Sequence, residues 1–123
     1  MSIINKIRQF HEEMIAWRRE IHRYPELAFE ETRTSDFVAA KLKEFGIKVH
    51  RGFAKTGVVG TISNGEGPSI GLRADMDALP LEEKNSFEHA STYPGKMHAC
   101  GHDGHITMLL GAAKYLVTSK DFK

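Results

Sequence analysis

The stretch Leu42–His50, LKEFGIKVH, contains the point where the pattern of the chain changes from helix to strand. Before it, a helix is predicted from Glu31 to Phe45, with an apolar face formed by Phe37, Val38, Leu42 and Phe45. Gly46 stands where a helix commonly ends in a left-handed residue, and Ile47 follows as the usual apolar closing contact. Ile47 and Val49 then alternate with polar residues, as in a short strand.

The segment on the N-terminal side predicts another helix, which Pro25 ends. Its apolar residues recur at intervals of three and four, on one stripe that favours packing in the core: Ile3, Ile7, Phe10, Met14, Trp17 and Ile21. On the C-terminal side, Gly57–Ser63 and Ser69–Ala74 are strand candidates. The turn-rich residues 64–67 between them predict a hairpin.

The remainder predicts an irregular segment over residues 78–96 and then a helix with Asp103 as its N-cap. The apolar face of this helix comprises Ile106, Leu109, Leu110, Ala113, Leu116 and Val117. The order of elements indicates an α/β fold in which helices cover a mixed sheet. Residues 1–123 show no internal linker and are interpreted as one domain or part of one.

Composition excludes several classes of function. The 123 residues include 17 basic and 16 acidic side chains, for a net charge of +1, so nucleic-acid binding is not expected. No apolar run approaches the roughly 20 residues that span a bilayer, and no membrane association is expected. The N-terminus lacks the continuous apolar stretch of a secretory signal, which predicts a cytoplasmic protein. The single cysteine forms no internal disulfide.

Potential metal ligands are concentrated in Met97–His105, MHACGHDGH. A thiolate at Cys100 and an imidazole at His102 suit zinc and neighbouring transition metals, and His98 and His105 are further candidates. Because the start of a helix repels a bare cation, a metal here also needs carboxylates. These are available in Asp75-Met76-Asp77, at the carboxyl end of a predicted strand, where ligands commonly bind. The spacing favours a metal site, while a cysteine nucleophile or an ordinary buried cysteine with surface histidines and turn-forming aspartates stay open.

Two longer motifs, Gly71–Pro80 (GLRADMDALP) and Met97–His105, resemble the amidohydrolase branch of the M20 metallopeptidases, which includes hippurate hydrolases and N-acyl-L-amino acid amidohydrolases. Residues 18–27 and 29–31 resemble the start of that branch. The resemblance implies a zinc-peptidase-like catalytic domain with two divalent metal ions (manganese, zinc, nickel or cobalt). It also implies hydrolysis of the amide bond of small N-acyl amino acids.

Carried over residue by residue, the resemblance makes Cys100 and His102 metal ligands and Asp77 the catalytic-site aspartate that orients a ligand. Asp75 stands where other M20 branches have a ligand histidine. The resemblance assigns no role to His98, Asp103 or His105.

The chain departs from the family pattern after its last predicted helix. There the family has a Glu-Glu pair that provides the general base and a ligand, then two ligand histidines and a lid domain that serves dimerisation. The Glu-Glu pairs of this chain, at 12–13, 30–31 and 82–83, all precede the Cys-x-His motif. We therefore expect residues 1–123 to be the N-terminal part of a catalytic domain without the lid domain. Alone it should be inactive, with a homodimer possible only for the complete protein. The alternatives are a non-catalytic remnant or interaction fragment, and a cysteine hydrolase that uses Cys100.

Overall fold

The end of helix α3 has the form that the sequence predicts. In the computed structural model, which describes residues 1–123, α3 spans Thr32–Glu44 and Gly46 has a left-handed φ of 81°. The amide of Gly46 donates to the carbonyl of Lys43 at 2.9 Å, and the amide of Ile47 donates to the carbonyl of Leu42 at 2.9 Å. These two bonds satisfy carbonyls that the helix leaves free and turn the chain into strand β1, Lys48–Phe53.

The predicted hairpin between residues 57–63 and 69–74 is wrong. Strand β2, Gly57–Thr61, pairs instead with β1 in a two-stranded antiparallel sheet, so the predicted mixed sheet is also absent from the structure. Residues 54–56 join these neighbouring strands, and closing so short a loop has a small entropic cost. Ala54 and Lys55 adopt positive φ there, which is unusual for both residue types and explains why the sequence did not reveal the turn.

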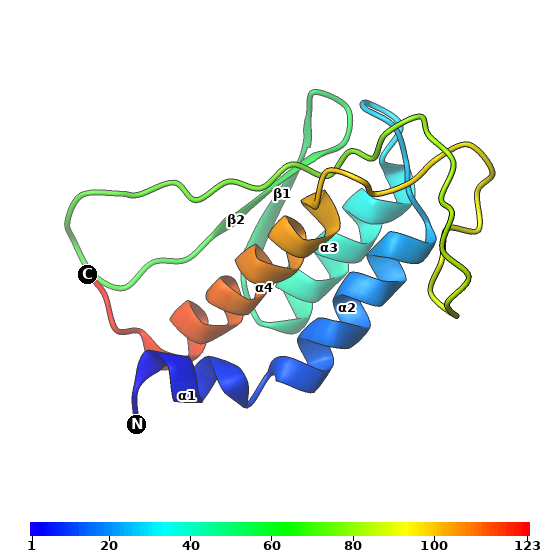
Figure 1. The fold of residues 1–123 in the computed structure, drawn as a ribbon. Helices are drawn as coiled ribbons and strands as arrows, with labels where there is room; N and C mark the ends of the chain where they lie inside the picture. The colour runs from blue at the N-terminus through cyan, green and yellow to red at the C-terminus, as the bar shows by residue number, and fades with distance from the viewer.

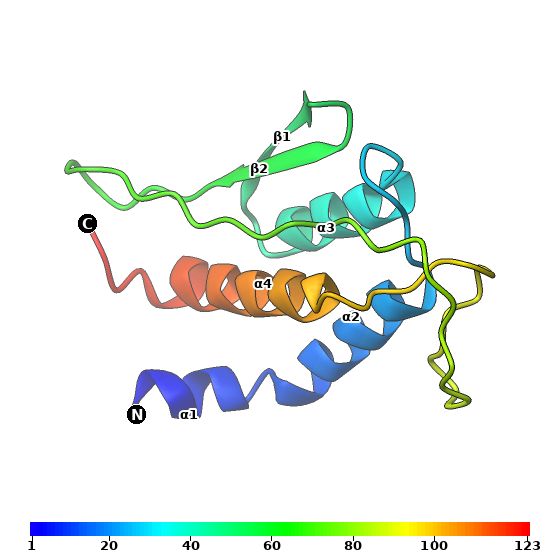
Figure 2. The ribbon, with the colours of Figure 1, turned by 45° about the horizontal axis from the view of Figure 1, so that its top comes forward.

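The turn at residues 64–67 is held away from the sheet. The side-chain amide of Asn64 donates to the carbonyls of Lys120 (2.9 Å) and Phe122 (2.6 Å), next to the C-terminal end of the chain. From this turn, residues 69–74 run back in an extended form without forming a ladder with either strand (Figure 2).

The single N-terminal helix that the apolar stripe predicts is divided in two. Helix α1 spans Ile3–Arg8 and α2 spans His11–Arg23. At the break, the amide of Phe10 bonds to the carbonyl of Ile7, three residues back, instead of four. The change of direction lets α1 contact α4, and neither glycine nor proline marks it in the sequence.

Helix α4, His102–Ser119, crosses the molecule in front of α3 in Figure 1, and Figure 2 shows it between α3 on one side and α1 and α2 on the other. It packs against α1, α2 and α3, and the hairpin formed by β1 and β2 covers α3. The buried apolar core is formed by Trp17, Ile21, Leu42, Ile47, Ile106 and Leu110. The α/β character of the prediction is confirmed, although most of the core lies between helices.

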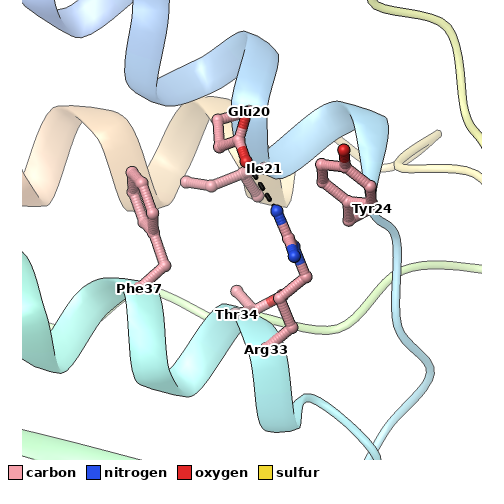
Figure 3. Close-up of a pocket in the computed structure, with 6 residues that line it drawn as sticks. All are labelled: Glu20, Ile21, Tyr24, Arg33, Thr34 and Phe37. Atoms are coloured by element: carbon pink, nitrogen blue, oxygen red, sulfur yellow. Dashed lines mark hydrogen bonds and ion pairs between the residues drawn. The ribbon is translucent and has the colours of Figure 1, made fainter.

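An ion pair connects α2 and α3 at the edge of this layer (Figure 3). The guanidinium of Arg33 lies 2.7 Å from the carboxylate of Glu20 and 3.6 Å from the ring centre of Tyr24. The hollow that they border has a volume of about 10 Å³, about enough for one water molecule, so it is too small for a substrate.

The irregular segment predicted for residues 78–96 is confirmed, and its ends are attached to the loop between α2 and α3 and to each other. The amide of Ala78 donates to the carbonyl of Glu26 at 2.8 Å, and Leu79 and Met97 form an isolated antiparallel bridge. This bridge brings the residues before Leu79 next to those after Met97, although nearly twenty residues separate them in the sequence.

None of the helices is long and apolar enough to cross a membrane.

Candidate metal centre

Three potential ligands from the two motifs lie together. Single donor atoms from Asp75, Asp77 and His102 are all within 4.8 Å of one another. The two aspartates follow the extended segment 69–74, and His102 is the first residue of α4. The bridge between Leu79 and Met97 holds the two segments in this arrangement.

Asp77 contacts the ring of His102 directly. The Nδ1 atom of His102 lies 2.8 Å from the carbonyl oxygen of Asp77 and 3.0 Å from its Oδ1 atom. Because both Asp77 atoms are acceptors, Nδ1 carries the proton and donates it. The other ring nitrogen, Nε2, is then the one whose lone pair is available to a metal, an arrangement common for histidine ligands.

Asp75 is more exposed than the other two members. Its Oδ1 atom lies 3.0 Å from Nε of Arg73, whose side chain is itself exposed. This ion pair partly balances the charge of the two neighbouring carboxylates. A cation bound at the cluster would provide the same balance more directly, because a divalent ion carries twice the charge of a guanidinium.

The structure does not bring Cys100 into this group. Cys100 is exposed and precedes Gly101, the left-handed N-cap of α4 with a φ of 89°. His105 is also exposed, with its ring centre 5.8 Å from that of His102. The assignment of Cys100 as a ligand stays a prediction.

Asp103 is not the N-cap that the sequence predicts. It lies in the first turn of α4, with 1% of its side chain exposed, and it accepts a hydrogen bond from Nδ1 of His22 at 2.8 Å. The Nε atom of Arg18 is 3.5 Å from the same carboxylate oxygen. The reason for the error is tertiary: the side chain is directed towards α2 instead of the free amides of its own helix.

His22 also contacts a second carboxylate. Its Nε2 atom lies 3.0 Å from Oε1 of Glu83, and Glu83 further accepts hydrogen bonds from Asn85 and from the amide of Ser91. Burial by itself would raise the pKa of Glu83, but these hydrogen bonds and the nearby charge of His22 lower it below its ordinary value. Sequence reasoning did not find this pair, because its members are about sixty residues apart.

His98 is buried among these groups without a hydrogen bond. Neither ring nitrogen has a partner, and only 4% of the residue is exposed. Burial is the main reason that the pKa of His98 falls from 6.5 to about 4; the neighbouring Asp103 acts in the opposite direction, and His22 and His102 add to the decrease. His98 is therefore neutral near pH 7.

The chemistry of the clustered donors fits a divalent metal ion. Two carboxylates and one imidazole provide oxygen and nitrogen ligands that zinc, manganese and cobalt accept. The cluster is also partly open to solvent, as a catalytic metal requires for a water or substrate position. The donors of the cluster are thus suited to hold a catalytic metal ion.

Comparison with known proteins shows which class of protein the chain is similar to. Residues 71–123 match Peptidase family M20/M25/M40. The chain is 56% identical to an IAA-amino acid hydrolase ILR1-like 2 of Arabidopsis thaliana, over 84% of this chain and 24% of that protein. It is 50% identical to a hippurate hydrolase of Campylobacter jejuni, over 96% of this chain and 31% of that protein.

The fold agrees with this similarity. The Bacillus subtilis YXEP protein, described as a dinuclear metal binding peptidase from the M20 family, superimposes with a TM-score of 0.86 and 39% identity. The match covers 91% of this chain and 32% of that one. The chain is similar in sequence and fold to members of the M20 peptidase family, and it spans between about a quarter and a third of the length of these relatives.

Proposed function

We propose that this chain provides part of the metal centre of an M20-type amidohydrolase that cleaves the amide bond of N-acyl amino acids. The observation that carries the proposal is the cluster of Asp75, Asp77 and His102, assembled from the two motifs. The names of the two relatives support the substrate class, since hippurate and IAA-amino acids both join an acyl group to an amino acid through an amide.

Each member of the cluster has a separate task in this proposal. Nε2 of His102 and a carboxylate oxygen of Asp75 hold a divalent cation (manganese, zinc, nickel or cobalt), and Cys100 joins them or holds a second ion. Asp77 keeps the proton of His102 on Nδ1 and fixes the direction of the ring. When bound, such ions polarise the substrate carbonyl and make a bound water more acidic.

A cysteine hydrolase has less support. A nucleophilic thiol needs a base within hydrogen-bonding distance. In the structure, the ring nitrogens of His98 have no partner and Nδ1 of His102 is bonded to Asp77, and no hydrogen bond joins either histidine to Cys100. The two functions also differ in a simple test, because only the thiol enzyme would be insensitive to chelators.

A titration of the metal-free chain with Co²⁺, followed by visible absorption, tests the proposal. We expect a saturable spectrum with weak affinity. In Asp77→Ala the affinity should fall by about tenfold or more, because Nδ1 of His102 loses its carboxylate acceptor and keeps only the carbonyl of residue 77. Glu66→Ala is a matched control, since Glu66 is an exposed carboxylate outside the cluster. Equal Co²⁺ affinity in all three proteins, or no spectrum at all, would contradict the proposal.

The same chain should show little or no hydrolysis of N-benzoylglycine, even with metal added. The clustered donors include no separate carboxylate that is free to act as a general base, because Asp77 is bonded to His102 and Asp75 to Arg73. Metal-dependent turnover by the 123 residues would show that they include a base we have not assigned.

The cytoplasmic location that the sequence suggests stays a prediction.

A further inference from the structure

A series of buried and half-buried hydrogen bonds connects helix α2 to the turn that carries the proposed metal ligands. Asp103, which directly follows His102, accepts from Nδ1 of His22 at 2.8 Å. On the other side of the ring, Nε2 of His22 is 3.0 Å from Glu83. The carboxylate of Glu83 accepts in turn from the amide of Ser91 at 2.7 Å. Three segments far apart in the sequence therefore meet at His22: α2, the loop over residues 81–91, and the start of α4.

We propose that His22 is a positioning residue for the metal centre. By holding the side chain of Asp103, His22 fixes the backbone of the first turn of α4, and with it the point from which the His102 ring extends towards Asp75 and Asp77. The proposal rests on the proposed function in that it assumes a metal at this cluster.

The start of α4 needs such support because its own cap is weak. The N-cap is Gly101, which has no side chain to accept a hydrogen bond from the free amides of the first turn. Helix ends without caps fray readily. The buried bond between Asp103 and His22, together with the bond between His102 and Asp77, holds this turn from both sides.

The hydrogen-bonding capacity of His22 explains why a histidine stands at this position. The lowered pKa of Glu83 favours its ionised form beside Nε2, and the carboxylate of Asp103 lies beside Nδ1. Each ring nitrogen of His22 therefore faces a carboxylate, in directions that diverge across the ring. Glutamine reaches only one of the two carboxylates at a time, and alanine reaches neither.

Co²⁺ titration of His22 variants tests the proposal on the full 123-residue chain. We expect His22→Ala to weaken Co²⁺ binding by about 10- to 100-fold, the range seen when residues that orient metal ligands are lost. The absorption spectrum at saturating Co²⁺ should also change, because the His102 ligand adopts another geometry. His22→Gln should recover part of the affinity.

The matched control is Glu31→Gln. Glu31 is also buried, at 7% exposure, and its carboxylate accepts from the hydroxyl of Thr56 at 2.6 Å, outside the network. This variant should lose stability but retain wild-type Co²⁺ affinity and spectrum. If His22→Ala behaves in the same way, folded with unchanged affinity and spectrum, then His22 is only structural and the proposal is wrong.

Hydrogen exchange without metal separates this proposal from the metal assignment. In the wild type, the amide of His105 is bonded to the carbonyl of Gly101 at 3.0 Å, in the first turn of α4. We expect His22→Ala to accelerate exchange of this amide much more than that of Leu110 or Tyr115. This local pattern would support positioning even if the wild type bound no Co²⁺, a result that would refute only the metal assignment. Equal acceleration along the whole of α4 would overturn the positioning role.

Discussion

The start of α4 and the extended segment over residues 69–74 both belong to the two sequence motifs. They differ in how far their side chains are buried and bonded to the rest of the chain. At the start of α4, Asp103 is 1% exposed and is bonded to His22. In the extended segment, Ile70 is 88% exposed and Leu72 is 59% exposed, and no ladder forms. The difference shows that the side chains of a motif are buried and bonded where the chain itself provides their partners. The apolar side chains of residues 69–74, which no neighbouring strand covers, are exposed to solvent.

The largest expected difference is between two leucines. Leu110→Ala should lower the free energy of unfolding by about 3 kcal/mol, because Leu110 is 2% exposed in the core and its loss leaves a cavity. Leu72→Ala should change it by less than about 0.5 kcal/mol. Urea unfolding followed by circular dichroism measures both. Similar losses would mean that the extended segment is packed in solution.

A second pair of variants tests the charged groups of the two regions. Asp103→Ala should cost about 2 kcal/mol of unfolding free energy, because it leaves the buried ring of His22 without one of its acceptors. Asp75→Ala, measured with chelator present, should change stability by less than about 0.5 kcal/mol, since this carboxylate is exposed. If Asp75→Ala proved as costly as Asp103→Ala, the two regions would be equally ordered.

The buried environment beside α4 should also make stability depend on pH. The folded chain holds the pKa of His98 at about 4, against 6.5 ordinarily, so between these values the unfolded chain binds more protons. The contribution of His98 to the free energy of unfolding is fully present above about pH 6.5. It decreases as the pH falls towards 4, by up to about 1.4 kcal/mol per pH unit.

Chemical unfolding of the metal-free chain at several pH values measures this slope. The control is His98→Phe, which keeps a ring of similar size that does not titrate. Its slope between pH 6.5 and 4 should be smaller than that of the wild type. Parallel curves would show that His98 is hydrated in solution.

The smallest expected free energy is that of the local opening that exposes the amides of residues 69–74 to exchange. The amides of residues 69–74 donate no backbone hydrogen bonds, so their exchange with solvent should be within about tenfold of the unprotected rate. The amide of Leu110, in the middle of α4, should require nearly global unfolding. Hydrogen exchange followed by mass spectrometry compares the two. Strong protection of residues 69–74 would indicate that they pair with another strand, such as one from a second copy.

Much of the local structure could be predicted from the sequence. The end of α3 at Gly46 was correct because both hydrogen bonds that form it join residues within five positions of each other. The division between α1 and α2 was missed, because the apolar stripe continues through Phe10 and neither glycine nor proline marks the break. For the site, the motifs led to Asp77 and His102, which the structure brings together, but also to Cys100, which lies outside the cluster.

The sequence by itself determined the helical stripes, the turn at Gly46 and the two motifs that carry potential ligands. These depend on neighbours along the chain, whose spacing sets which side chains share a face. Only the tertiary structure decided that β2 pairs with β1, and that Asp103 is directed to His22 and Glu83. Several partners were locally possible for these groups. The choice among them depends on which arrangement buries the apolar core while leaving the fewest polar groups without hydrogen bonds.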